Sequence, residues 1–356
     1  MFTRPSFVIL GAMLAASAMF SLPAAWAAEP PAKKLFGSKK EAADLRAKSI
    51  GSYARGCLAG GKMLPISGPG WEAMKLQRNR NWGHPHLIAF LTRFATEAQE
   101  QDGWPGLLIG DLSQPRGGPM LTGHKSHQIG LDADIWFRPK PAKPLSNKER
   151  SDSWSIPLAG QYSRTVTKNW KPGYVKLIKR AASYPQTARI FLHPAVKKAL
   201  CESAGDDRAW LQKVRPWWGH NFHFHVRLKC PVGVAGCVDQ NPPPVGDGCG
   251  AQLNDWMKKL EAAEKWSKKP KKPGKPKARK ELRLADLPQD CRGVLEATPA
   301  KASSAPPAAA TPLPQRSGAI PAPARPAARP ASTDPNLPWL KGVTNSGTPM
   351  PVRKPR

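Results

Sequence analysis

The stretch WWGHNFHFHVRL, residues 217–228, contains the clearest strand signal in the chain and decides its fold class. Apolar and imidazole side chains alternate from Phe222 onward, and this period of two is typical of a β-strand with two different faces. The pattern therefore places His223 and His225 together on one face. The opposite face is apolar and consists of Phe222, Phe224 and Val226.

A third histidine of this stretch, His220, is out of phase with the other two. It follows Gly219, a residue type that favours turns, so we expect His220 on the loop that enters the strand. The three histidines are a large share of the eight in the whole chain. Their concentration in one short segment indicates a site.

A second polar cluster lies in GHKSHQIGLDADIWF, residues 123–137, which contains His124, His127, Asp132 and Asp134. Asp132 and Asp134 share strand parity, so the two clusters offer imidazoles and carboxylates from distant points of the chain. A catalytic zinc ion takes three such protein ligands and leaves a fourth position for water. The pattern favours a metal site. A structural polar network and an adventitious histidine-rich surface are the alternatives.

The other segments show helical and strand patterns in mixed order. Apolar residues at helical spacing predict a helix over residues 84–101, with Gly103 as its stop. Regular βαβ spacing and a glycine-rich phosphate loop are both missing from the sequence. This favours an α+β fold: a single domain whose central, largely antiparallel sheet carries the metal ligands, flanked by helices and stapled by disulfides. The remaining predicted elements are strands at residues 107–111, 133–137, 188–193 and 222–228 and helices at residues 174–182 and 194–200.

The first residues have the order of a secretory signal peptide. Arg4 is followed by an apolar run and then by Ala25, Trp26 and Ala27, a small-x-small cleavage site. A membrane anchor is the alternative, but the apolar run is short, and no later segment approaches the roughly 18 apolar residues of a membrane-spanning helix. We therefore expect a periplasmic protein without a membrane span, with a signal peptide at residues 1–27 and a folded domain at residues 28–298.

The chain is strongly basic, with a formal net charge of +30. Much of the excess lies in a Lys-rich loop at residues 258–283 and in a Pro/Ala/Lys-rich tail at residues 299–356. We expect both segments to be disordered because they offer too little apolar surface to fold. A basic exported protein is attracted to an anionic envelope surface, and nucleic acid is a poor partner for a protein that leaves the cytoplasm.

Six cysteines in an oxidising compartment predict three disulfides, in any of fifteen pairings. A thiol metal site is the alternative, and the lack of a CxxC pair argues against it. Three disulfides leave no thiol free as a nucleophile, and the sequence contains neither an HExxH nor a GxSxG motif. Metal-activated water is the hydrolytic mechanism that remains. The cysteines are Cys57, Cys201, Cys230, Cys237, Cys249 and Cys291.

In chain order, His127, Asp134, His223 and His225 form HxxxxxxD…HxH, which resembles the signature of the lysostaphin, D-Ala-D-Ala peptidase and hedgehog-type metallopeptidases. Longer segments resemble one family of that group, the penicillin-insensitive murein endopeptidases, over most of the chain from Ser49 to Cys291. The matching segments are SIGSYARGC (49–57), GHPHLIAFL (83–91), LIGDLSQPRGG (108–118), GHKSHQIGLDADIWF (123–137), KVRPWWGHNFHFHVRLKCP (213–231) and PPPVGDGCGAQLNDW (242–256).

The resemblance implies an exported zinc enzyme that hydrolyses the D-alanyl–meso-diaminopimelyl cross-link of peptidoglycan. It implies that His127, Asp134 and His225 bind the zinc ion, with His124 as an additional metal contact. It implies that His223 is the catalytic histidine and that His220 is a further histidine of the catalytic site. It also implies a homodimer and three disulfide pairs, which are Cys57–Cys291, Cys201–Cys249 and Cys230–Cys237.

The sequence departs from the family pattern at one point. Some members carry a further aspartate and histidine that are associated with a second zinc ion, but residues 138–192 contain no histidine and a single aspartate, Asp152. We therefore do not expect a second ion of that kind. Two alternatives to an endopeptidase stay open: a D,D-carboxypeptidase or dipeptidase that acts on stem peptides, and a non-catalytic cell-wall or metal-binding module.

Overall fold

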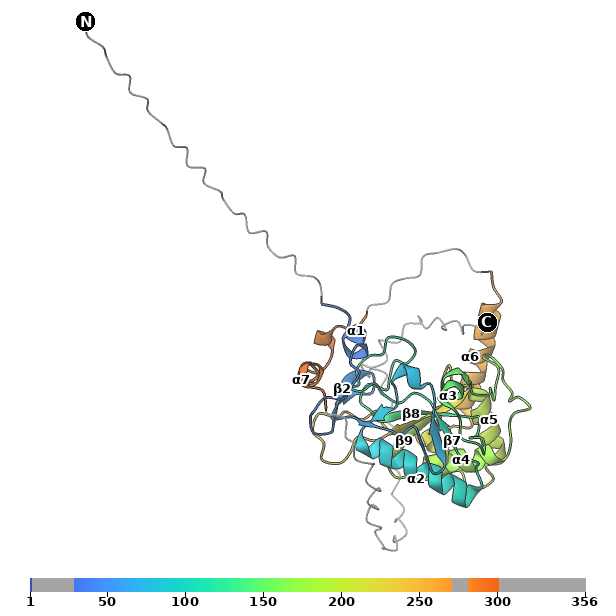
Figure 1. Ribbon diagram of the computed structural model, residues 1–356. Helices are drawn as coiled ribbons and strands as arrows, with labels where there is room; N and C mark the ends of the chain where they lie inside the picture. Colours follow the sequence, from blue (N-terminus) through green and yellow to red (C-terminus); the bar gives the residue numbers. More distant parts are fainter. Residues whose placement is uncertain (2–28, 271–280, 301–356) are drawn as a thin grey trace, which may run out of the picture.

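The computed structural model describes Met1, residues 29–270 and residues 281–300, whose arrangement is shown in Figure 1. Three predicted segments lie outside the described residues: the signal peptide at residues 1–27 apart from Met1, residues 271–280 of the Lys-rich segment, and the tail at residues 299–356 apart from its first two residues. Within the described part of the chain, none of the helices is long and apolar enough to cross a membrane.

A seven-stranded sheet forms the centre of the fold, in the order β10-β9-β11-β8-β7-β5-β4. The pairs β10–β9 and β5–β7 are parallel and the other four pairs are antiparallel, so the prediction of a largely antiparallel sheet is confirmed. The strands are β4 (Ser67–Gly68), β5 (Trp71–Ala73), β7 (Leu107–Ile109), β8 (Asp132–Trp136), β9 (Thr187–Leu192), β10 (Val214–Pro216) and β11 (His223–Leu228).

One face of this sheet is apolar and packs against two helices, α2 (Pro85–Asp102) and α4 (Gly173–Ser183), which lie along the sheet in Figure 1. Phe224 and Val226 of β11 are fully buried in this core, as the alternation in the sequence predicts. The opposite face of β11 and of its neighbour β8 therefore carries the polar side chains.

A histidine side chain caps the N-terminus of two of the helices. His84 precedes α2 and His193 precedes α5 (Pro194–Ser203), and in each case the ring Nδ1 accepts a hydrogen bond from the backbone N–H two residues later. Proline at the first helical position needs no such partner, because it has no N–H. The helix α2 ends at Gly103, which has a left-handed φ of 69°, as predicted.

The two ends of the described domain meet in a second apolar cluster, where α1 (Ala32–Gly37), α7 (Asp290–Glu296) and the ribbon of β1 (Lys48–Ser52) and β2 (Arg55–Ala59) pack together. The Cys57–Cys291 disulfide joins this cluster covalently. The other disulfides are Cys201–Cys249 and Cys230–Cys237, so all three pairs are those that the resemblance implies. The remaining elements are β3 (Lys62–Met63), β6 (Trp82–Gly83), α3 (Asn147–Asp152) and the 3-10 helices η1 (Leu76–Arg78), η2 (Ala209–Lys213) and η3 (Leu284–Asp286).

Arg116 holds this terminal cluster together although its guanidinium is buried. Its Nη1 donates to the carbonyl oxygens of Val294, Leu295 and Ala297 at 2.8–3.0 Å, and its Nε donates to the carbonyl of Glu41. The carbonyls at the C-terminal end of α7 carry the negative end of the helix dipole. The cation is therefore stabilised by a helix end.

The prediction of a Lys-rich loop over residues 258–283 is wrong for its first part. Residues 258–267 belong to the helix α6 (Ala251–Ser267), which packs beside α5. Leu253 and Leu260, seven residues apart, are buried on one side of α6, which gives the helix an apolar stripe despite its many lysines. Pairs at i,i+4 such as Lys265 with Glu261 add support on its exposed side.

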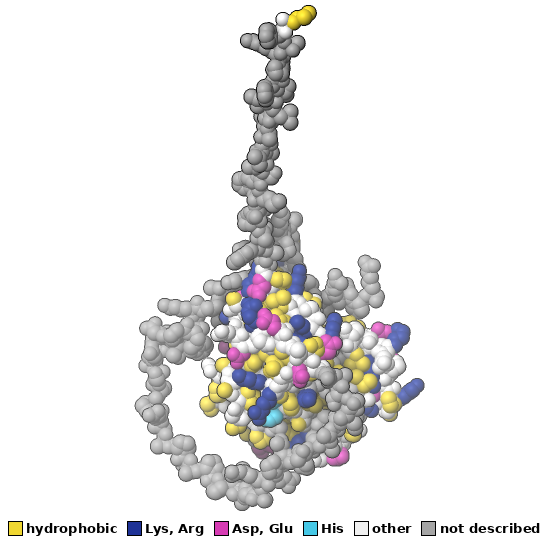
Figure 2. Space-filling model, turned by 60° about the vertical axis from the view of Figure 1, so that its left-hand side comes forward, with side chains coloured by type: hydrophobic (Ala, Val, Ile, Leu, Met, Phe, Trp, Pro, Cys, Tyr) yellow, Lys and Arg dark blue, Asp and Glu magenta, His cyan; other side chains and the backbone are white. Residues whose placement is uncertain are grey.

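The surface of the described domain mixes basic, acidic and apolar side chains, as the face drawn in Figure 2 shows. Histidine forms only a small patch on that face. This fits the low exposure of the imidazoles, since four of the eight histidines are buried and three are half-buried, which leaves His86 as the single exposed one.

Candidate metal centre

The pairing of β8 with β11 creates the candidate site. His225 lies directly opposite Asp134 in the antiparallel register, and Arg227 lies opposite Asp132. Opposite residues of an antiparallel pair point to the same face. The side chains of Asp132, Asp134, His223 and His225 therefore emerge together from the face of the sheet that α2 and α4 leave free.

His127 reaches the same point from the loop before β8. Its backbone adopts a left-handed φ of 69°, which is uncommon for any residue except glycine and which the surrounding structure must stabilise. The stabilising contacts are clear: the His127 N–H donates to Asp132 Oδ2 at 2.9 Å, and the His127 carbonyl accepts from Ser113 Oγ at 2.5 Å. The strained backbone turns the fully buried ring toward Asp134.

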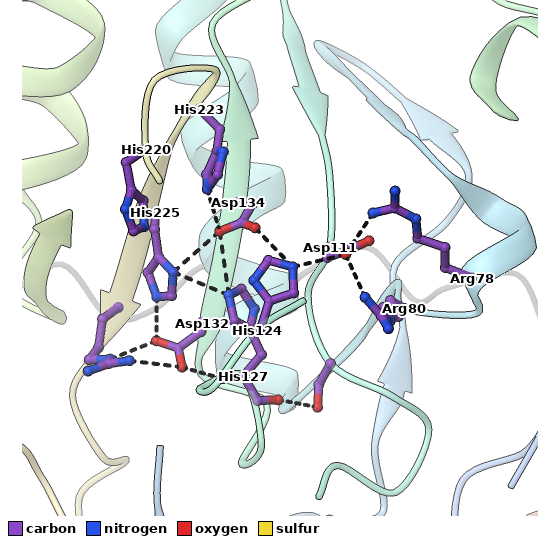
Figure 3. Close-up of polar contacts among 12 residues, drawn as sticks. Arg78, Arg80, Asp111, His124, His127, Asp132, Asp134, His220, His223 and His225 are labelled. Atoms are coloured by element: carbon purple, nitrogen blue, oxygen red, sulfur yellow. Dashed lines mark hydrogen bonds and ion pairs between the residues drawn. The ribbon is translucent and has the colours of Figure 1, made fainter. Parts of the chain in front are cut away.

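Three side-chain atoms form a small triangle at the centre of Figure 3. His127 Nε2 lies 3.2 Å from His225 Nδ1, His225 Nδ1 lies 3.3 Å from Asp134 Oδ1, and Asp134 Oδ1 lies 3.4 Å from His127 Nε2. Bonds of 2.0–2.1 Å in a tetrahedron put two ligand atoms about 3.3 Å apart. Asp134 Oδ1 is buried and has no hydrogen-bond partner. The residues therefore fit a tetrahedral metal ion.

Asp132 lies behind this triangle and orients two of its members. Its Oδ1 accepts from His225 Nε2 at 2.8 Å and from Arg227 Nε at 2.7 Å, while its Oδ2 accepts from the backbone of His127. Because Nε2 of His225 carries the proton, Nδ1 presents its lone pair to the triangle. Burial raises the pKa of Asp132, but Arg227 and His225 outweigh burial and hold this pKa below its usual range.

His124 lies at the edge of the triangle, between two carboxylates. Its Nε2 is 3.0 Å from Asp111 Oδ2 and 3.5 Å from Asp134 Oδ2. The ligand atoms of His124, His127 and Asp134 also lie within 4.8 Å of one another, so this group could hold an ion too. The triangle that includes His225 is tighter, and Asp111 Oδ2 already accepts from Arg78 and Arg80 at 3.0 Å each. These two guanidinium groups disfavour a second cation beside Asp111.

His223 and His220 border the triangle on the side of β11. His223 Nε2 is 3.4 Å from Asp134 Oδ1. The ring of His220 lies 4.9 Å from the ring of His223 between centroids, and its Nδ1 is 2.7 Å from the carbonyl of Trp218, to which it donates. Burial lowers the pKa of His223, and burial lowers the pKa of His220 well below its ordinary value. Burial therefore favours the neutral form of both rings.

The structure thus brings together the six residues to which the sequence gives a role in the site, and Asp132, which the sequence places in the same polar cluster, lies with them. His220 lies on a loop, as predicted. Sequence reasoning gave no role to the residues that support them. Strand parity is a signal for two of these, since Asp132 and Arg227 lie two positions from Asp134 and His225, respectively, on the same strand face. The residues without any such signal are Arg78, Arg80, Asp111 and Ser113.

Comparison with known proteins adds independent findings. Residues 49–296 match the family model described as penicillin-insensitive murein endopeptidase. A protein of that name from Haemophilus influenzae is 44% identical over 214 residues, which cover 60% of this chain and 74% of the relative. A protein of the same name from Klebsiella pneumoniae subsp. pneumoniae is 40% identical over 250 residues, which cover 70% of this chain and 86% of the relative.

Proposed function

This chain belongs to the penicillin-insensitive murein endopeptidase family, and we propose that it is a zinc-dependent enzyme that hydrolyses the D-alanyl–meso-diaminopimelyl cross-link of peptidoglycan. The observation that carries this proposal is the triangle of His127 Nε2, Asp134 Oδ1 and His225 Nδ1, with edges of 3.2–3.4 Å. Two imidazoles and one carboxylate form a ligand set that catalytic zinc ions use, with one position left for water.

The three ligands of the triangle would hold the ion, and His124 would lie beside it as an additional contact. A bound zinc ion supplies a Lewis acid that makes water a good nucleophile near neutral pH. The chain itself supplies the rest. Asp132 keeps His225 in the tautomer that binds metal, and the backbone contacts of His127 keep its ring aimed at Asp134.

In this proposal His223 accepts the proton of the attacking water and passes it to the leaving amine. Its Nε2 lies close enough to Asp134 to reach the same small volume. His220 has a different part. Because its Nδ1–H donates to Trp218, a neutral His220 presents only a lone pair at Nε2. It would donate a hydrogen bond to the developing oxyanion only in its protonated form, which the charge of the oxyanion favours and burial opposes.

The domain limits and the setting belong to the same proposal. Residues 1–27 would act as a signal peptide that directs the protein to the periplasm, residues 28–298 would form the enzyme, and residues 299–356 would form a tail. The folded part would act as a homodimer on peptidoglycan. Mass spectrometry of the mature N-terminus from a periplasmic fraction tests the cleavage site.

The decisive experiment digests purified peptidoglycan with the zinc-loaded protein, with and without a chelator, and identifies the soluble fragments. Loss of cross-linked dimers that the chelator prevents is the expected result. Loss of terminal D-alanine alone would replace the proposal with a D,D-carboxypeptidase. Unchanged peptidoglycan after incubation with a zinc-loaded sample would leave a non-catalytic wall-binding or metal-binding module.

A further inference from the structure

Three tryptophans gather beside the candidate metal centre, and we call them the aromatic shelf. Trp217 and Trp218 follow β10, and Trp256 lies on α6. The ring centroid of Trp256 is 6.0 Å from that of Trp217 and 5.4 Å from that of Trp218. Trp217 is 53% exposed and Trp218 is 37% exposed, although proteins bury most of the surface of a typical tryptophan. Exposed indoles in a group mark a binding surface.

The aromatic shelf is continuous with the candidate metal centre. Phe191 of β9 connects them, because its ring centroid lies 6.0 Å from that of Trp217 and 5.3 Å from that of His225. The ring of His220 lies 6.2 Å from Phe191 on the same side. A single aromatic side chain therefore separates a proposed metal ligand from the first exposed indole. A molecule that occupies the centre and extends toward β10 must cross the shelf.

The backbone that presents the aromatic shelf is fixed in place. The N–H of Trp217 donates to the carbonyl of Leu192 at 2.8 Å, and the N–H of His193 donates to the carbonyl of His220 at 3.0 Å. Between these anchors Gly219 takes a left-handed φ of 76°, which completes the turn. The backbone that carries the two exposed indoles is thus preorganised, so a ligand need not order this turn on binding.

Positive charge flanks the aromatic shelf on α6. The ammonium group of Lys259 lies 4.9 Å from the ring centroid of Trp256, and Lys258 beside it is exposed. Flat apolar surfaces next to ammonium groups fit an uncharged or anionic ligand with a flat C–H face and disfavour a cationic one.

We propose that the aromatic shelf binds the glycan strand of murein, with a sugar ring against an exposed indole, while the attached stem peptide reaches the metal centre. This inference rests on the proposed function, because the proposed substrate, peptidoglycan, carries sugar rings. A pyranose presents a flat face of C–H groups to an indole. The small side chains of D-alanine offer far less apolar area, so the glycan is the better occupant.

The first test measures glycan binding without any hydrolysis. Peptide-free glycan strands, released by an amidase, are titrated into the zinc-loaded protein and followed by tryptophan fluorescence and calorimetry. We expect Trp217→Ala and Trp256→Ala to weaken binding by about tenfold or more, as truncation of a central aromatic contact does. Trp266→Ala is the matched control, because Trp266 is a 48% exposed indole on the same helix. Its binding should equal that of the unaltered protein.

These strands contain no scissile amide, so the result does not depend on whether the proposed hydrolysis occurs. A second measurement compares KM for cross-linked dimers with and without their glycan. The variants of Trp217 and Trp256 should raise KM more for the glycan-bearing dimer, by about tenfold in ratio. The proposal is overturned if unaltered protein fails to bind glycan strands or if the two variants bind them normally. Sedimentation can also overturn the proposal. If Trp217→Ala abolishes a protein dimer but keeps normal affinity for glycan strands, the aromatic shelf binds a second copy of the chain instead.

Discussion

Asp132→Asn tests whether Asp132 orients the proposed metal ligands, because the substitution changes this carboxylate and leaves the ligand residues in place. The carboxylate accepts four hydrogen bonds, from the backbone of His127, from His225 Nε2 and from two guanidinium nitrogens of Arg227. An asparagine has one carbonyl oxygen, so its NH₂ group must face donors on one side. The substitution leaves the proposed metal ligands present but poorly oriented.

The expected size follows from these contacts. Loss of a carboxylate that orients a metal-bound histidine costs 10- to 100-fold in metal affinity, which corresponds to about 1.4–2.7 kcal/mol. The same change also leaves the guanidinium of Arg227 buried without its carboxylate, which costs about 3 kcal/mol of folding free energy. Arg227 is 8% exposed and Asp132 is fully buried, so water does little to offset either effect.

Two assays distinguish the effects. Zinc affinity is measured by competition with a chromophoric chelator, and stability is measured by urea unfolding of the metal-free protein. The double variant Asp132→Asn with Arg227→Gln should regain part of the lost stability, because the unpaired charge is gone. It should not regain zinc affinity. If Asp132→Asn binds zinc as tightly as the unaltered protein, the orienting role assigned to this carboxylate is wrong.

Three further predictions concern single side chains. His225→Ala should lose both zinc binding and hydrolysis, whereas His223→Ala should keep zinc and lose hydrolysis. Metal analysis measures the bound zinc, and analysis of the soluble peptidoglycan fragments measures hydrolysis. If His223→Ala stays active, His223 is not the base. Arg116→Met should lower the free energy of unfolding by about 3 kcal/mol in urea, because three carbonyls of the α7 end lose a charged donor; a loss below about 0.5 kcal/mol would contradict the role given to Arg116. Burial and the neighbouring His86 lower the pKa of His84 to about 4, against 6.5 when it is unperturbed. The unfolded chain therefore takes up the proton first as pH falls, and stability that is complete above pH 6.5 decreases by about 3 kcal/mol by pH 4. His84→Asn, which keeps an acceptor for the helix end, should remove this part of the pH dependence.

Local patterns in the sequence predict the parts of the fold that depend on local physics. The alternation around Phe224 predicts β11 within one residue, because a two-sided strand must alternate its side chains. Gly103 marks the end of α2 because helix-terminating signals act within a few residues. The same parity argument groups His223 with His225 and Asp132 with Asp134, and the register of β8 with β11 brings the two pairs face to face.

Other features depend on contacts that no local pattern reveals. The lysines of α6 conceal a helix that is stabilised by packing of Leu253 and Leu260, so composition alone misleads there. Arg78 and Arg80 are 33 and 31 positions from Asp111 in the chain, so only the tertiary fold reveals these contacts. The short strands β3 and β6, with two residues each, have no periodicity to detect. Their pairing follows from the tertiary fold.

The Cys57–Cys291 disulfide has a topological consequence. It joins residues 234 positions apart, so most of the domain forms one covalent ring. A single protease cut anywhere inside that ring leaves the two fragments tethered, and they separate on a gel only after reduction. Closure of the ring also has to wait until almost the whole domain has been synthesised and has met an oxidant. Among the three disulfides, which span 234, 48 and 7 positions, this one therefore joins the first segment of the domain to the last.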